Sequence, residues 1–139
     1  MKKIFVILAL ILVFTPSAFA ADYRYVAAKD LRDWLGEGKS ILLVDIQEAK
    51  DFATHHIKGS LETNSYPVKS DEDRQRLKPA LQKNQDTGYE SVVVVCPRGK
   101  GGAKRTYDYL KEHGIPVEKL HILTGGMKNW PYSEWVETK

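Results

Sequence analysis

The sequence predicts an α/β domain with an open, mostly parallel β-sheet flanked by helices. Two observations predict this fold. Continuous apolar runs at 41–44 and 92–95, and the mostly apolar segment 120–123, are typical of buried parallel strands, and segments with helical spacing of apolar residues alternate with them. A chain of 139 residues, 42% hydrophobic and 28% charged, has the composition of one globular domain with a hydrophobic core. This composition excludes a multidomain assembly, a disordered chain and a small disulfide-stapled fold.

Residues 1–20 are typical of a secretory signal peptide. Two lysines precede an apolar run of eleven residues, and an Ala-x-Ala cleavage pattern ends at Ala20. Eleven residues are fewer than the roughly 20 that span a bilayer, so we expect cleavage rather than the alternative, an uncleaved anchor. The mature chain then begins at Ala21, and residues 21–139 form a single domain. We expect a periplasmic or secreted protein without stable membrane association.

The formal net charge of +3 comes mostly from this signal segment. Residues 1–20 hold two of the 21 basic residues and none of the 18 acidic ones, which leaves 19 basic against 18 acidic side chains in the mature chain. A nearly neutral domain without a long basic run has no electrostatic footprint for nucleic acid or for an anionic membrane surface. Any preference for an anion must therefore be local.

The first half of the mature chain is predicted to hold two helices and two strands. Leu31, Trp34 and Leu35 lie at helical spacing, and two glycines follow them. The next apolar run is short enough for a strand that is buried on both faces. We expect, in order, a helix over 27–35, a strand over 41–44 that ends at Asp45, a short helix over 48–54 with Phe52 inward, a turn over 55–59 and a strand near 60–63.

The second half begins with a helix that a proline interrupts. Ser70 and the three acidic residues after it resemble a helix N-terminus, because serine caps free N–H groups and acids favour the positive end of the helix. Pro79 is expected to bend or divide this helix. Four consecutive valines then suit a central parallel strand. We expect, in order, a strand over 91–95, Cys96 at its end, a loop over 97–102, a helix from Ala103 to Gly114, a strand over 120–123, a glycine turn at 125–126 and a short element over 127–130.

Cys96 is the only cysteine, and it is predicted at the carboxyl end of the central strand, the edge where open parallel sheets bind ligands. Oxidising compartments favour paired cysteines. A lone exported thiol is therefore either a buried core residue or a group whose chemistry is used. The segment 97–102 favours the second reading, since a glycine-rich turn into a helix can point backbone N–H groups at the sulfur.

Such a turn would form an anion cradle around the sulfur. Its glycines permit the backbone conformations that the turn needs, and its basic side chains add positive charge. The cradle would favour the Cys96 thiolate and attract an anionic substrate whose electrophilic atom approaches the sulfur, which is covalent catalysis. The alternative is a tight turn with a solvated basic surface. The residues that we expect to bind substrate are Pro97, Arg98, Gly99, Lys100, Gly101 and Gly102.

Three parts of the sequence resemble the rhodanese-like sulfurtransferases. Residues 95–103 resemble that family's Cys-x-x-Gly-x active-site loop. Residues 43–45, 51–52 and 56–60 are similar to its Val-Asp, Glu-Phe and His-Ile-x-Gly-Ala pattern, and residues 123–130 to its Leu-x-Gly-Gly-x-x-x-Trp signature. The order and spacing agree over nearly the whole mature chain. One such motif is a weak indication, but three in register are a strong one.

The resemblance implies a single rhodanese-like domain with sulfurtransferase activity. Cys96 would attack the outer sulfur of thiosulfate or a related small anionic donor and become a persulfide, and a thiol or cyanide would then accept that sulfur. Arg98 and Lys100 would steer and hold the donor, while inward N–H groups stabilise the charge on the leaving sulfite and on the persulfide. No cofactor is expected, and a redox protein is a candidate partner.

Three positions depart from the family pattern. Gln47 stands where the family often has an arginine, His55 where a glycine usually precedes the motif's histidine, and Gly101 where arginine, threonine or serine is frequent. A missing side-chain contact at Gly101 leaves the identity of the donor and the rate open. Cys96 itself is present, which argues against a catalytically inactive relative.

Asp45 and His56 are assigned to structural support, with both expected to stabilise turns at the sheet edge. Four histidines and one cysteine offer no close metal-ligand spacing. His55 and His56 are adjacent on an extended or turning segment, so their side chains would point apart. We therefore expect no metal site.

Two alternative functions differ in what Cys96 does. A cysteine phosphatase or arsenate reductase with a related loop needs an arginine six residues after the nucleophile, and that position is Gly102. Without this guanidinium the oxygens of the transferred group lose their bidentate partner, which argues against the class. A noncatalytic periplasmic carrier of sulfane sulfur or selenium, or an adaptor module, would hold a persulfide without fast turnover and stays open.

Overall fold

The computed structural model describes residues 22–139, and the predicted signal segment 1–20 lies outside them. Five strands form one parallel sheet in the order β1-β6-β5-β2-β4. These strands are β1 (Tyr25–Val26), β2 (Ile41–Asp45), β4 (Leu61–Glu62), β5 (Ser91–Val95) and β6 (Leu120–Leu123). The predicted α/β architecture, with a mostly parallel sheet flanked by helices, is confirmed.

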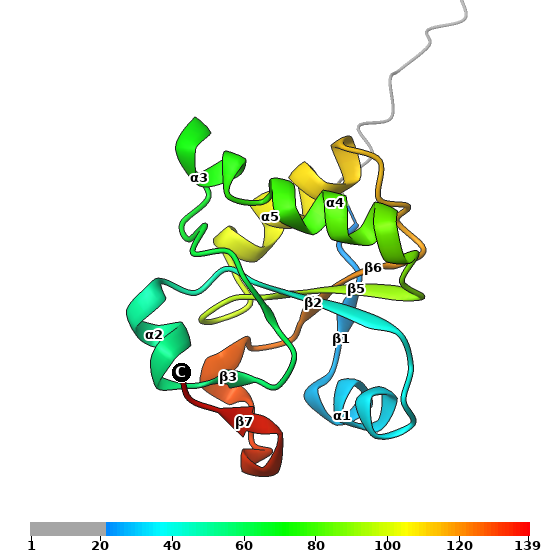
Figure 1. Ribbon diagram of the computed structural model, residues 1–139, viewed down its shortest axis with the longest axis vertical. Helices are drawn as coiled ribbons and strands as arrows, with labels where there is room; N and C mark the ends of the chain where they lie inside the picture. Colours follow the sequence, from blue (N-terminus) through cyan, green and yellow to red (C-terminus); the bar gives the residue numbers. More distant parts are fainter. Residues whose placement is uncertain (1–21) are drawn as a thin grey trace, which may run out of the picture.

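Helices cover both faces of this sheet. Figure 1 shows α3, α4 and α5 on one side of the sheet and α1 on the other. A second, antiparallel pair joins β3 to β7 near the C-terminus. The remaining elements are α1 (Ala28–Gly36), α2 (Ala49–Thr54), β3 (His56–Ile57), α3 (Asp71–Gln75), α4 (Lys78–Thr87), α5 (Gly101–Glu112), the short 3-10 helices η1 (Met127–Asn129) and η2 (Ser133–Trp135), and β7 (Val136–Glu137).

The central strands β2 and β5 are buried on both faces, as their continuous apolar runs predict. Successive side chains of a strand point to opposite faces. The even-numbered apolar residues of both strands pack in one core cluster with α4 and α5, and their odd-numbered ones pack in the other cluster with Leu31 of α1. This central position places the carboxyl ends of β2 and β5 side by side, with Asp45 paired to Val95.

The predicted helix after Ser70 is divided into α3 and α4. The Oγ of Ser70 accepts a hydrogen bond from the backbone N–H of Asp73 at 3.0 Å, and a carboxylate oxygen of Asp73 accepts one from the N–H of Ser70 at 3.3 Å. This reciprocal capping box starts α3. Pro79 lies in the first turn of α4, where its missing N–H costs no helical hydrogen bond.

Two details differ from the sequence-based expectation. The helix expected from Ala103 begins at Gly101, because its tertiary setting outweighs the low helix propensity of two glycines. The strands β1, β3 and β7 were not predicted as strands, since two residues each give no periodic pattern. Within residues 22–139, no helix combines the length and apolar character that crossing a bilayer requires.

Candidate active site

Cys96 directly follows β5, and it lines a small cavity of about 130 Å³. The residue is only 2% exposed. A reagent or substrate therefore reaches its sulfur through this cavity. Cys96 is the single free cysteine in the part of the chain that the structure describes. The predicted nucleophile therefore lines a cavity at the carboxyl end of the central strand.

The loop after Cys96 curls so that a backbone N–H faces the sulfur. The N–H of Gly99 donates a hydrogen bond to the Cys96 Sγ over 2.8 Å. Gly99 has a φ of +70°, a conformation that residues with a Cβ resist. Helix α5 starts two residues later, and the first N–H groups of a helix have no acceptors within it. The sulfur thus lies where amide donors and the positive helix end favour negative charge.

A second segment, which contains Met127 and Lys128, forms backbone hydrogen bonds with this loop. The N–H of Met127 donates to the carbonyl oxygen of Cys96 at 2.9 Å, and the N–H of Lys128 donates to that of Pro97 at 3.0 Å. Gly126, at a φ of +61°, lies directly against the loop. A Cβ on Gly126 would come within 2.7 Å of the Gly99 nitrogen, closer than such contacts occur. The glycine pair before η1 therefore positions the cysteine loop.

The structure brings most of the predicted binding residues together around the cavity. Gly99 is the exception, because it lies behind the sulfur and donates to it instead of lining the opening. Tyr66, on the segment between β4 and α3, lines the cavity and was not predicted, since no periodicity or motif marks this segment. The lining residues are Tyr66, Cys96, Pro97, Arg98, Lys100, Gly101 and Gly102.

The two basic side chains of the loop are available to an anion. Arg98 and Lys100 are both exposed. Among residues 22–139, neither forms an ion pair. Their charge is therefore uncompensated at the rim of the cavity, where it attracts a small anion.

Asp45 is buried at the end of β2, and its contacts belong to the turn that follows. Its two carboxylate oxygens accept hydrogen bonds from the Gln47 backbone N–H at 2.9 Å and from the Gln47 Nε2 at 3.0 Å. Burial raises the pKa of Asp45 to about 6, although both Gln47 hydrogen bonds act to lower it. Gln47 also donates to the carbonyl oxygen of His55 at 3.2 Å. A neutral amide thus stabilises this turn where the family often places an arginine.

His56 makes buried structural contacts with α2 and with the C-terminal strand β7. It belongs to β3 and is buried, and its ring stacks on Phe52 with centroids 3.8 Å apart. Its Nδ1 lies 2.7 Å from the carbonyl oxygen of Phe52, and its Nε2 lies 3.3 Å from a carboxylate oxygen of Glu137. His56 therefore joins α2 to the C-terminal strand β7.

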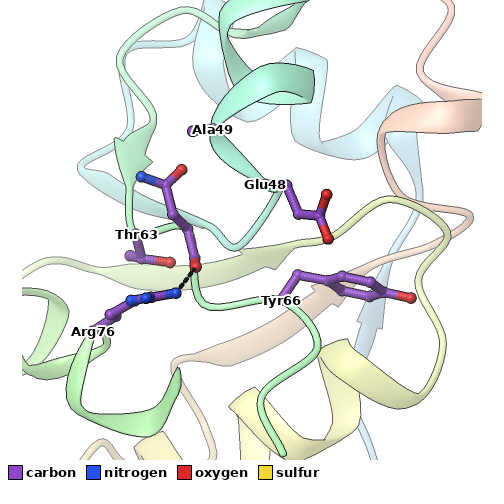
Figure 2. Close-up of a pocket in the computed structure, with 6 residues that line it drawn as sticks. Glu48, Ala49, Thr63, Tyr66 and Arg76 are labelled. Carbon is purple, nitrogen blue, oxygen red and sulfur yellow. Dashed lines mark hydrogen bonds between the residues drawn. The ribbon is translucent and has the colours of Figure 1, made fainter. Parts of the chain in front are cut away.

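Two further openings share lining residues with the Cys96 cavity. One, of about 210 Å³, is lined by residues that include His55, Pro97, Arg98 and Lys128. The other is a groove of about 640 Å³ that shares Tyr66 with the Cys96 cavity. Figure 2 shows this groove. It is lined by Glu48, Ala49, Thr63, Asn64, Tyr66 and Arg76, and we refer to it as the Arg76 groove. Over residues 22–139, no cluster of three or more metal-ligating side chains occurs.

The comparisons with known proteins agree with this geometry. The family model described as the rhodanese-like domain matches residues 27–132. Among solved structures, a rhodanese-like domain protein from Staphylococcus aureus is 23% identical, with a TM-score of 0.62 over 84% of this chain and 98% of its own. A yeast protein tyrosine phosphatase of the rhodanese family is 20% identical, with a TM-score of 0.64 over 84% and 93%.

A thiosulfate sulfurtransferase from Pseudomonas aeruginosa is 21% identical, with a TM-score of 0.64 over 84% of this chain and 20% of its own. Identities this low establish a shared fold. The solved neighbours include both a sulfurtransferase and a phosphatase. The reaction of this chain must therefore be inferred from its own site.

Proposed function

The chain belongs to the rhodanese-like domain family, and we propose that it is an exported sulfurtransferase that works through a persulfide on Cys96. The donor is thiosulfate or a related small sulfane anion, and the acceptor is a thiol or, in assays, cyanide. The observation that carries the proposal is the 2.8 Å hydrogen bond from the Gly99 N–H to the Sγ of Cys96, a residue that lines a cavity of about 130 Å³. This cavity suits a small anion, and the N–H donor suits a thiolate.

The first step transfers one sulfur atom. The Cys96 thiolate attacks the outer sulfur of thiosulfate, a sulfur–sulfur bond forms on Cys96, and the bond to the sulfonate sulfur breaks with its electron pair leaving as sulfite. The reactants and the products both carry three negative charges, so the total charge of the site does not change during the step. The Gly99 N–H and the free N–H groups at the start of α5 support the charge on the persulfide. Arg98 and Lys100 attract the dianionic donor and hold the departing sulfite.

The decisive experiment compares the wild type with Cys96→Ala in a thiosulfate and cyanide assay. We expect turnover in the wild type and none in the variant. Intact-mass spectrometry after thiosulfate alone should show one added sulfur on the wild type. Equal rates in both proteins would contradict the proposal. A matched variant, Ser91→Ala on β5, the strand that precedes Cys96, should keep the rate.

The deep burial of Cys96 favours one second function, a sulfur carrier. A persulfide on Cys96, a residue that is only 2% exposed, is shielded from solvent, so it persists until a suitable acceptor reaches the cavity. A stable added sulfur without turnover on cyanide would favour this reading, with a redox protein as the natural acceptor.

A phosphatase or arsenate reductase reaction is disfavoured by the position six residues after Cys96. Gly102 is buried there, and a Cβ on it would lie 3.0 Å from the Tyr66 ring. An arginine side chain would have to displace Tyr66 to reach the cavity. Hydrolysis of an aryl phosphate at a rate comparable to sulfur transfer would overturn this part of the proposal.

An exported location is supported by the predicted signal segment. Mass measurement of the protein from a periplasmic or culture fraction should show a mature chain that begins at Ala21. A chain that retains residues 1–20 would contradict it.

A further inference from the structure

Two glycines that line the Cys96 cavity have side chains from other positions packed against them. A Cβ on Gly101 would lie 2.9 Å from the Nη1 of Arg105, and a Cβ on Gly102 would lie 3.0 Å from the Tyr66 ring. The first contact is within α5, and the second joins α5 to the segment between β4 and α3. The absence of side chains at both glycines therefore leaves room for Arg105 and Tyr66 beside the cavity.

The Tyr66 ring separates the Cys96 cavity from the Arg76 groove. Tyr66 lines both openings, which measure about 130 Å³ and about 640 Å³. Figure 2 shows the ring extending away from Arg76. The residue is 38% exposed, so its ring lies at the protein surface and not in the core. Removal of the ring would therefore join the small cavity to the much larger groove.

Arg105 fixes the segment that carries Tyr66. Its Nε and Nη2 both donate to the carbonyl oxygen of Pro67, at 3.0 Å and 2.9 Å. Two N–H groups of one planar guanidinium on a single acceptor restrict how the two groups can move relative to each other. The N–H of Tyr66 donates to the carbonyl oxygen of Ile46 at 2.9 Å. The segment is thus joined to α5 on one side and to the end of β2 on the other.

The backbone just after Tyr66 is strained. Val68 has a φ of +62°, a conformation that is a genuine outlier for a β-branched residue. Its side chain is fully buried in the core cluster that includes α4 and α5, and its N–H donates to the carbonyl oxygen of Ser65 at 2.8 Å. Such strain persists only where surrounding contacts fix it, and it is most frequent at functional sites. The position of Tyr66 is therefore strongly constrained.

The leaving group of a sulfur donor has to fit beside the Tyr66 ring. A thiolate attacks the outer sulfur along the axis of the bond that breaks, so the sulfonyl end of the donor lies on the side away from the Cys96 Sγ. That end must share the cavity of about 130 Å³ with the ring. A sulfonyl group that carries only oxygen or a methyl group is compact, whereas an aryl group adds a six-membered ring.

We propose that Tyr66, positioned by Arg105, limits the sulfur donor of Cys96 to small sulfane anions and excludes aryl thiosulfonates. Tyr66 is then a specificity-determining residue, because its ring lines the cavity. Arg105 is a positioning residue that acts through the Pro67 carbonyl. This inference rests on the proposed sulfurtransferase function.

The transfer from a thiosulfonate balances without an added oxidant or reductant. The Cys96 thiolate attacks the outer sulfur and forms a sulfur–sulfur bond. The bond from that sulfur to the sulfonyl sulfur breaks, and its electron pair leaves with the sulfinate. The reactants and the products both carry two negative charges. Methanethiosulfonate and benzenethiosulfonate react by this same step and carry the same charge, so they differ in the size of the group next to Tyr66.

The test measures kcat/KM of the mature chain for both thiosulfonates, with cyanide as the acceptor. Tyr66→Ala should raise the ratio of the benzenethiosulfonate value to the methanethiosulfonate value about tenfold over that of the wild type. Tyr66→Phe is the matched control and should keep the wild-type ratio, since it retains the ring and loses only the hydroxyl. Turnover of methanethiosulfonate shows that each variant is folded and that its Cys96 reacts.

Arg105→Ala tests the positioning role while Tyr66 itself stays in place. It should raise the same ratio by at least about threefold, because the ring is held less firmly. Arg74→Ala is its control, since Arg74 lines the same opening beside α5 and forms an ion pair with Asp71. Loss of that positive charge should leave the ratio unchanged. An unchanged ratio in Tyr66→Ala and Arg105→Ala, or an equal rise in Tyr66→Phe or Arg74→Ala, would overturn the inference.

The wild-type protein separates this inference from the proposed function. If neither thiosulfate nor methanethiosulfonate adds sulfur to Cys96, the sulfurtransferase function fails. If both add sulfur while all variants share the wild-type ratio, only the role of Tyr66 fails.

Discussion

The Gly126→Ala substitution tests how the cysteine loop is held. Gly126 has a φ of +61°, and its Cβ would lie 2.7 Å from the backbone nitrogens of Arg98 and Gly99. With ψ at −161°, Gly126 lies in a region that is essentially restricted to glycine; a non-glycine residue there costs about 1–3 kcal/mol, and overpacking a filled site costs about 1–3 kcal/mol more. The overlap falls on backbone that cannot rotate away, so the loop must shift.

Gly88→Ala measures the cost of a positive φ in the left-handed helical region, with ψ at +53°, where the new Cβ is unhindered; Gly126, with ψ at −161°, lies outside that region. Gly88 has a φ of +66°, and its Cβ would meet nothing within 4 Å. We expect Gly88→Ala to lower the free energy of unfolding by about 1 kcal/mol, and Gly126→Ala by about 2–6 kcal/mol. Urea unfolding of the wild type and both variants measures the difference.

The same comparison tests the function of the loop. A shift of Gly99 lengthens its N–H contact with the Cys96 sulfur, so Gly126→Ala should slow both alkylation of Cys96 and sulfur transfer at least tenfold in the folded protein. Gly88→Ala should leave both rates unchanged. Equal destabilisation by the two variants, together with equal alkylation rates, would refute the view that the glycine pair positions the cysteine loop.

The remaining predictions address charge, pH and capping. Arg98→Ala combined with Lys100→Ala should raise the KM for thiosulfate more than it slows alkylation of Cys96, because backbone N–H groups favour the thiolate and the side chains bind the donor; equal losses would contradict this. The pKa of Asp45 is raised to about 6 from the roughly 3.9 of an unfolded aspartate, so its contribution to stability is present below about pH 4 and is lost as the pH rises through 6. The free energy of unfolding of Asp45→Asn, measured in urea, should therefore increase relative to that of the wild type between pH 4 and pH 7, by up to about 3 kcal/mol. A difference between the two proteins that stays constant over this pH range would show that burial does not raise the pKa of Asp45. Ser70→Ala should lower the unfolding free energy by about 1 kcal/mol through loss of its cap, whereas no change would mean that the capping box does not form.

Much of the fold could be predicted because its central strands are buried on both faces. Continuous apolar runs at β2 and β5 leave few alternatives to a parallel sheet, and they place Asp45 and Cys96 at its carboxyl edge. The capping box at Ser70 and the division of the helix near Pro79 follow from local chemistry that the sequence shows directly.

The missed features depend on contacts between distant segments. Tyr66 reaches the active-site cavity because its ring packs on Gly102, 36 positions later in the chain, and no local pattern encodes that contact. His56 stacks on Phe52 and meets Glu137 only because β3 pairs with β7, two strands of two residues each. The glycine-rich loop predicted inward N–H groups around the sulfur, but which of them donates to it depends on the path of the loop, and the structure gives this role to Gly99.

The most direct test of the whole account is intact-mass spectrometry of the folded wild-type protein after incubation with thiosulfate, with and without prior alkylation by iodoacetamide. One added sulfur should appear on Cys96, the residue whose sulfur accepts the Gly99 N–H, and prior alkylation should prevent the addition. No added sulfur, addition at another residue, or alkylation of Cys96 only after unfolding would contradict the role of Cys96 as the nucleophile.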